Sequence, residues 1–150
     1  QVDFAITNYP NSGLSNTQNV RIIREFKDVF VANDEYKELR GKTISLKDLK
    51  RFPILMLDRK STTSEFLHSM FQRHQLDLVP EIELSSNDLL IDLARIGLGV
   101  AFVPDYCIPD NERSLFKVQI EEELPTRQIV VASNDSLPIS QAAKQFMEML

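Results

Sequence analysis

Residues 82–104 carry the clearest pattern of apolar and polar positions in the chain. Residues 82–84 alternate as a short strand does, and Ser85 and Asp88 then have the spacing of a capping box at a helix start. The positions that follow repeat at steps of three and four, so they predict a helix with one apolar face. That face consists of Leu89, Leu90, Leu93, Ala94 and Ile96.

Gly97 is expected to end this helix, because glycine adopts the left-handed conformation of a helix C-terminus at low cost. An apolar run at residues 100–103 follows and stops at Pro104, which predicts a buried strand. Asp92 and Arg95 share the polar helix face, and we interpret them as a surface ion pair. The whole stretch therefore predicts one βαβ unit.

The rest of the chain also alternates between strands and helices. Ser45 with Asp48, and Thr62 with Glu65, have capping-box spacing at two further helix starts. Because this alternation runs from residue 35 to residue 84, we expect a parallel α/β sheet. Strands are expected at residues 2–6, 20–26, 29–32, 53–57, 116–120 and 127–132, a loop at residues 7–13, and a closing amphipathic helix within residues 139–150.

The segment that begins at Ser86 and ends at Pro104 reads S-x-x-L-L-x-x-L-A-x-x-G-L-G-V-A-F-V-P. It resembles the effector-domain signature of LysR-type transcriptional regulators. Three further segments are similar to that family in the expected order, namely residues 2–6, 44–49 and 53–57. The resemblance thus covers almost the whole chain.

This resemblance implies an α/β, periplasmic-binding-protein-like (type 2) fold with two lobes, of which the first is incomplete. Residues 1–27 are then part of the first lobe, residues 28–126 are the second lobe, and residues 127–150 return to the first lobe as a strand and a closing helix. Because the chain starts at Gln1 inside an expected strand, we interpret it as a fragment. The resemblance implies that a DNA-binding helix-turn-helix lies upstream.

Composition narrows the classes of partner. The net charge is −5 and Lys and Arg are scattered, whereas a surface that holds DNA needs a basic patch. No stretch approaches the roughly 20 apolar residues that span a bilayer, so we expect a cytoplasmic protein with no membrane contact. The single cysteine, Cys107, excludes an internal disulfide and a cysteine-clustered metal site.

Two strand-to-helix junctions, at residues 58–64 and 85–87, are rich in hydroxyl groups. In an open α/β sheet both junctions lie at the carboxyl ends of the strands, where such folds bind ligands. Helix N-termini offer unpaired N–H groups and partial positive charge, and Arg59 and Lys60 lie beside the first junction, so we expect a small anion there. The alternative is that these hydroxyls are ordinary helix caps, although four in succession exceed what one cap needs.

The resemblance implies that an effector binds between the lobes, where these junctions and the loop after the first strand contact it. The candidate ligand-binding residues are Ser61, Thr62, Thr63, Ser86, Thr7 and Arg59. The expected partners are a small, anionic effector, further copies of the chain in a homo-oligomer, and DNA only through a domain absent from this chain.

We do not expect an enzyme, a cofactor or a metal site. The chain has no G-x-S-x-G motif, and His68 and His74 lie six residues apart, a poor spacing for sharing a helix face. Two other classes remain open: an extracytoplasmic solute-binding protein of a transporter with the same architecture, and an enzyme built on this two-lobed fold.

Overall fold

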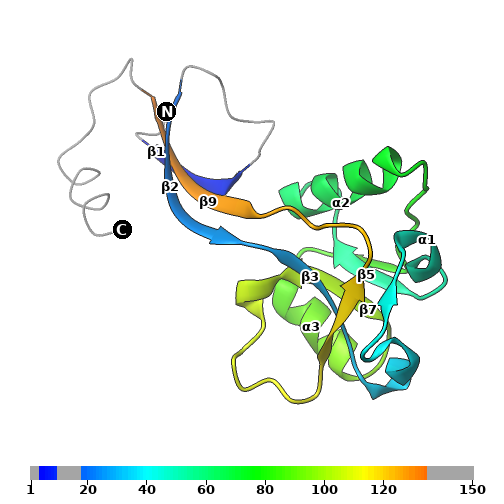
Figure 1. Ribbon diagram of the computed structural model, residues 1–150. Coiled ribbons are helices and arrows are strands. Elements are labelled where there is room, and N and C mark those ends of the chain that lie inside the picture. Colours follow the sequence, from blue (N-terminus) through cyan, green and yellow to red (C-terminus); the bar gives the residue numbers. More distant parts are fainter. Residues whose placement is uncertain (1–3, 10–17, 135–150) are drawn as a thin grey trace. The chain divides into compact units, whose positions relative to one another are not determined.

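The computed structural model describes the backbone of residues 4–9 and 18–134 and the side chains of residues 22–131. The chain forms two compact units, which can be followed by colour in Figure 1. Unit 1 takes the residues up to Phe26 and those from Thr126 onward, and unit 2 runs from Lys27 to Pro125. The closing helix expected within residues 139–150 lies outside the described residues.

The described part of unit 1 is a three-stranded antiparallel sheet in the order β1-β9-β2. Its strands are β1 (Phe4–Tyr9), β2 (Gln18–Phe26) and β9 (Arg127–Asn134). The loop expected at residues 7–13 is wrong for residues 7–9, because β1 continues to Tyr9 and Thr7 is paired with Val130. Pairing with a strand more than 100 residues away overrides the local turn tendency of this segment. Residues 10–13 lie outside the described residues.

Unit 2 is built on a six-stranded mixed sheet in the order β4-β8-β3-β7-β5-β6. Its strands are β3 (Asp28–Ala32), β4 (Thr43–Ile44), β5 (Ile54–Leu57), β6 (Ile82–Leu84), β7 (Val100–Pro104) and β8 (Phe116–Ile120). β5 is parallel to both β6 and β7, whereas β3 is antiparallel to β7 and β8. The parallel pairing expected from residues 35–84 is confirmed for β4, β5 and β6, whereas β3, which precedes that segment, makes the sheet mixed.

The βαβ unit expected over residues 82–104 is confirmed as β6, helix α3 (Asn87–Arg95) and β7. The two strands are not adjacent, because β5 lies between them: Leu55 faces Ile82 on one side and Ala101 on the other. All five residues of β7 are buried, as the apolar run predicts. Gly97 has a φ of +83°, which confirms it as the left-handed residue after the helix.

Helices cover both faces of this sheet. Helices α1 (Leu46–Leu49) and α2 (Thr62–Arg73) pack on one face, and α3 packs on the other. Two short 3-10 helices, η1 (Asp34–Leu39) and η2 (Asp105–Cys107), follow β3 and β7. In the described ranges no helix is long and apolar enough to cross a membrane.

The apolar face of α3 differs from the expected one. Leu90, Ile91 and Ala94 are buried against the sheet, whereas Leu89 is 45% exposed and Ile96 is 69% exposed. A nine-residue helix on a sheet covers only one stripe, and the sequence offers more apolar positions than that stripe can hold.

Candidate functional site

The two hydroxyl-rich junctions meet at one edge of the unit 2 sheet. Strands β5 and β6 are parallel and in register, with Leu57 opposite Leu84. One residue further on, the Asp58 N–H donates to the Leu84 carbonyl oxygen over 2.8 Å. The segments that lead into α2 and α3 therefore leave the sheet side by side. This edge gathers five of the six expected site residues, and the sixth, Thr7, lies in β1 of unit 1.

Ser61 is the N-cap of α2. Its Oγ accepts a hydrogen bond from the Ser64 N–H over 3.0 Å and donates one to the Asp58 carbonyl oxygen over 3.0 Å. The capping box expected for Thr62 and Glu65 is therefore wrong by one residue. Thr62 is already the first helical residue, and a capping side chain must precede it. Both hydrogen-bonding functions of the Ser61 hydroxyl are used within the helix start.

The other residues at the α2 start differ in their access to solvent. Arg59 is exposed, Thr62 is half-buried, and Thr63 is only 2% exposed. The Lys60 N–H donates to Asp58 Oδ1 over 3.1 Å, so the acidic side chain of this loop is turned toward its backbone. Two cationic side chains, those of Arg59 and Lys60, are exposed beside the helix N-terminus.

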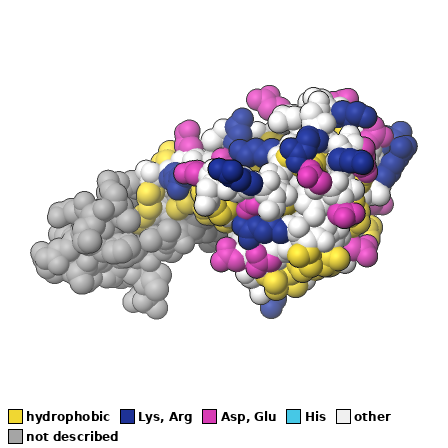
Figure 2. Space-filling model, turned by 90° about the horizontal axis from the view of Figure 1, so that it is seen from below, with side chains coloured by type: hydrophobic (Ala, Val, Ile, Leu, Met, Phe, Trp, Pro, Cys, Tyr) yellow, Lys and Arg dark blue, Asp and Glu magenta, His cyan; other side chains and the backbone are white. Residues whose placement is uncertain are grey.

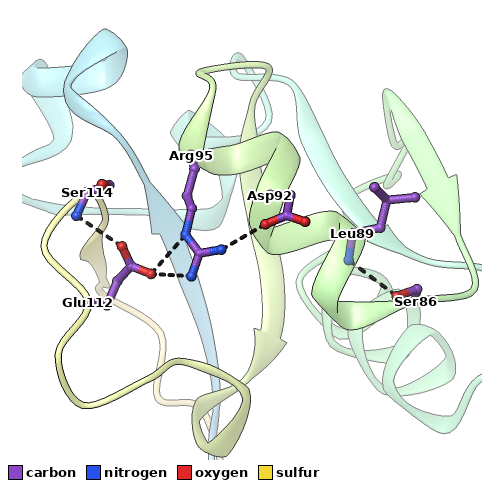
Figure 3. Close-up of polar contacts among 6 residues, drawn as sticks. All are labelled: Ser86, Leu89, Asp92, Arg95, Glu112 and Ser114. Atoms are coloured by element: carbon purple, nitrogen blue, oxygen red, sulfur yellow. Dashed lines mark hydrogen bonds and ion pairs between the residues drawn. The ribbon is translucent and has the colours of Figure 1, made fainter.

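Ser86 is the N-cap of α3, and its Oγ accepts from the Leu89 N–H over 3.2 Å (Figure 3). The expected capping box of Ser85 and Asp88 is again wrong by one residue, because α3 begins at Asn87. Unlike Ser61, Ser86 uses its oxygen for this bond and keeps its hydroxyl hydrogen for donation. Ser86 is also exposed.

The two helix starts differ in their charged neighbours. Burial and then the nearby carboxylates of Asp88, Asp28 and Asp105 raise the pKa of the Cys107 thiol, so acidic groups surround this thiol beside α3. At the α2 end, burial lowers the pKa of His68, the positive charge of Arg59 lowers it further, and the carboxylate of Glu83 raises it. Positive charge is therefore felt at the α2 start, together with a nearby carboxylate.

Three buried polar atoms near these junctions have no hydrogen-bond partner among the described residues: Ser64 Oγ, His68 Nε2 and Asn87 Oδ1. Ser64 and His68 lie one turn apart on α2, and Asn87 directly follows the α3 cap. Buried polar atoms are normally paired, so atoms of this kind mark places where an outside polar group can bind. The sequence patterns give no sign of them, because burial without a partner depends on packing.

A shallow cavity of about 540 Å³ lies at the opposite end of α2. It is lined by Met70, Arg73, His74, Glu122, Glu123 and Pro125, and by none of the expected site residues. Its charges of both signs give it no preference for an anion, and a helix C-terminus repels one. The cavity therefore offers no site suited to an anion. No group of three metal-binding side chains occurs within the described ranges.

The face of unit 2 seen in Figure 2 is not dominated by charge of one sign. In Figure 2, Lys and Arg side chains are interspersed with those of Asp and Glu on the face seen from below. One acidic residue missed by sequence reasoning is Glu112, which binds Arg95 (Figure 3). Arg95 and Glu112 lie 17 positions apart, and the residues between them carry no pattern that could have revealed this pair.

Comparison with known proteins identifies relatives of the chain. The HTH-type transcriptional regulator BsdA of Bacillus subtilis is 27% identical over 154 residues, covering 99% of this chain and 52% of BsdA. The HTH-type transcriptional activator CmpR of Synechocystis is 28% identical over 90 residues, covering 60% of this chain and 30% of CmpR. The chain thus spans about half the length of BsdA. Both relatives are transcriptional regulators, which favours that class over a transporter's solute-binding protein.

Solved structures share the fold. The regulatory domain of CcmR from Synechocystis, in complex with 2-PG, has a TM-score of 0.84 at 21% identity, covering 98% of this chain and 71% of that one. The effector-binding domain of QuiR, in complex with shikimate, has a TM-score of 0.81 at 18% identity, covering 97% and 68%. These similarities confirm the α/β, periplasmic-binding-protein-like fold. The family model of the LysR substrate binding domain matches residues 1–150, and the chain therefore belongs to the LysR substrate-binding domain family.

Proposed function

We propose that this chain senses a small anionic metabolite for a LysR-type transcriptional regulator and binds it at the edge formed by the α2 and α3 starts. The observation that carries the proposal is the parallel pairing of β5 and β6, which brings both helix N-termini to one edge. Arg59 and Lys60 supply positive charge at the α2 start. Backbone N–H groups and the helix dipole attract an anion to the same place.

The six candidate residues have different roles in this proposal. Arg59 and Thr62 contact the anion directly, because Arg59 is an exposed cation and Thr62 is a half-buried residue at the first position of α2. Ser61 and Thr63 shape that start, since the Ser61 hydroxyl is fully used and Thr63 is buried. Ser86 donates its hydroxyl hydrogen to a neutral or hydroxylated part of the ligand. Thr7, in β1 of unit 1, remains the sixth candidate.

In the proposed arrangement unit 2 is the second lobe, and unit 1 contains the described part of the first lobe. The proposed second lobe, residues 28–126, differs by one residue at each end from unit 2, which runs from Lys27 to Pro125. A ligand can shift the lobes only through its different affinity for two arrangements. DNA is contacted by another part of the protein, the chain acts as a homo-oligomer in the cytoplasm, and it binds its ligand without chemical change.

The test measures thermal stabilisation of the chain by inorganic phosphate, 2-PG and shikimate. A ligand present at 100 times its Kd adds about 2.7 kcal/mol of stability, or roughly 5–10 °C in Tm for a domain of this size. We expect Arg59→Gln to abolish the shift given by an anion that binds. Arg51→Gln removes an exposed cation at the end of α1, away from this edge, and should preserve the shift.

Two results would contradict the proposal. One is an anion-induced shift that survives unchanged in Arg59→Gln, which would place the anion elsewhere. The other is a Thr62→Ala variant whose Tm falls without ligand by as much as its ligand-induced shift does, which would show a structural role only.

A further inference from the structure

The carboxylate of Glu112 is held by three hydrogen bonds (Figure 3). Its Oε1 accepts from Arg95 Nη2 over 2.6 Å and from Arg95 Nε over 3.0 Å, and its Oε2 accepts from the Ser114 N–H over 3.0 Å. The Glu112 side chain is only 8% exposed. A carboxylate so shielded from water depends on these partners, because breaking a buried pair leaves an uncompensated charge.

Arg95 lies in the last turn of α3 and has two acidic partners, which differ in their exposure to solvent. Its Nη1 donates to Asp92 Oδ1 over 2.8 Å, but the Asp92 side chain is 62% exposed, so water screens that pair. The hydrogen bond from Arg95 lowers the pKa of Glu112, and the same bond raises the pKa of Arg95. The two directions agree, and both describe a pair that stays ionised.

The pair fastens one end of a segment that runs along α3. Residues 105–114 leave β7 where the Asp105 N–H donates to the Lys27 carbonyl oxygen over 2.8 Å. Cys107 and Ile108 then pack against the core on the α3 side of the sheet. The Asp88 charge at the α3 start acts on Cys107, whereas Glu112 binds the last turn of the same helix.

Between these two ends the segment has little to hold it. Pro109, Asp110 and Asn111 are exposed, and a single turn bond joins the Glu112 N–H to the Pro109 carbonyl oxygen over 3.0 Å. Segments with few buried contacts open at a lower free energy than the core does. The Arg95–Glu112 pair therefore attaches the later part of this segment to the last turn of α3.

We propose that Arg95 and Glu112 are positioning residues that hold residues 105–114 along α3 and thereby keep η2 beside the α3 start. The segment then forms a fixed wall of the ligand edge, and loss of the pair lets that wall open while the sheet stays folded. The statement about the ligand rests on the proposed function, whereas the attachment of the segment does not.

Cys107 reports the position of this segment because it is the only cysteine of the chain. We would measure its reaction rate with a thiol reagent, such as dithionitrobenzoate, in wild type and in Glu112→Gln, which keeps the side-chain shape but removes the charge. Rates taken from pH 7 to 9 separate a change in thiol pKa from a change in access. We expect the rate to rise about tenfold or more in Glu112→Gln, as for other locally opened segments.

Asp92→Asn is the matched control, because it removes the other acidic partner of Arg95 from an exposed position. Its rate should stay within about twofold of wild type. The exchange variant Arg95→Glu with Glu112→Arg should return the rate toward wild type. An unchanged rate in Glu112→Gln, or an equal rise in Asp92→Asn, would overturn the proposal.

Low concentrations of urea separate local opening from general destabilisation. Opening of a short segment exposes little surface, so the faster reaction of Glu112→Gln should depend only weakly on urea. A steep dependence on urea, matching that of global unfolding, would show that the pair acts only on overall stability and would overturn the proposal.

The claim that this segment forms a wall of the ligand edge is tested separately, by the Tm shift that shikimate or 2-PG gives. A smaller shift in Glu112→Gln, together with faster Cys107 labelling, supports the positioning role. Faster labelling with an unchanged shift overturns the claim about the wall and leaves the attachment standing. If no probe stabilises the wild type, the proposed anion site fails, and Cys107 labelling still decides whether the pair holds the segment.

Discussion

Gly99 packs directly against the carbonyl group of Pro53. A β-carbon at position 99 would lie 2.6 Å from that oxygen, and the next residue, Val100, donates its N–H to the same oxygen over 2.8 Å. The beginning of β7 thus lies against the residue before β5 through backbone atoms alone. The glycine is required by this close approach and not by its dihedral angles, since only Gly41 and Gly97 have positive φ among the described glycines.

Gly99→Ala should destabilise the chain, because a backbone oxygen cannot move aside as the end of a flexible side chain can. We expect a loss of about 3 kcal/mol in the free energy of unfolding, the upper part of the range for overpacking. Gly41→Ala is the control: its β-carbon would meet nothing within 4 Å, so only its φ of +72° is strained. That variant should lose about 1 kcal/mol. Equal losses in urea unfolding would contradict the close approach.

Ser86→Ala should cost about 1 kcal/mol, the usual value for a lost N-cap. Its neighbour Ser85 is also exposed, and it lies one residue before the observed cap. Ser85→Ala should therefore change the unfolding free energy by less than about 0.5 kcal/mol. A larger loss for Ser85→Ala than for Ser86→Ala would support Ser85 as the N-cap, as the sequence pattern predicts.

Ile91 and Ile96 offer a test of which face of α3 is packed. Ile91 is 2% exposed and Ile96 is 69% exposed, although the expected apolar face includes Ile96 and leaves out Ile91. Ile91→Ala should lose about 2–5 kcal/mol through lost burial and the cavity it leaves. Ile96→Ala should stay within about 0.5 kcal/mol of wild type. A large loss for Ile96→Ala would show that something covers this residue in solution.

Lowering the pH should reduce the free energy of unfolding, because Glu112 becomes protonated. Its pKa in the folded state is lowered from the ordinary 4.5, chiefly by the hydrogen bond from Arg95. The ionised pair therefore contributes its full stability above pH 4.5 and loses it as the pH falls through the lower, folded-state pKa. The difference in unfolding free energy between wild type and Glu112→Gln should be constant near neutral pH and shrink in acid. A difference in unfolding free energy that grows as the pH falls would contradict this prediction.

Local patterns predicted much of the fold because they depend on neighbouring residues. The βαβ unit, the buried run at residues 100–103 and the helix end at Gly97 all follow from periodicity and backbone preference. The expected cap at Ser45 is confirmed, because its Oγ accepts from the Asp48 N–H over 3.2 Å at the start of α1. The caps of α2 and α3 were placed one residue late and one residue early, since adjacent hydroxyls such as Ser85 and Ser86 are equivalent in the sequence. Only the helix geometry selects one of them.

The sequence by itself determined the elements and the gathering of hydroxyl-rich junctions at one strand edge, because parallel strands joined by helices must end together. Only the tertiary structure decided that β3 runs antiparallel, that β1 continues through Thr7, and that Glu112 reaches Arg95. Each of these depends on residues far apart along the chain meeting after it folds. Such pairings leave no trace in local periodicity, since they reflect which surfaces the whole chain brings together.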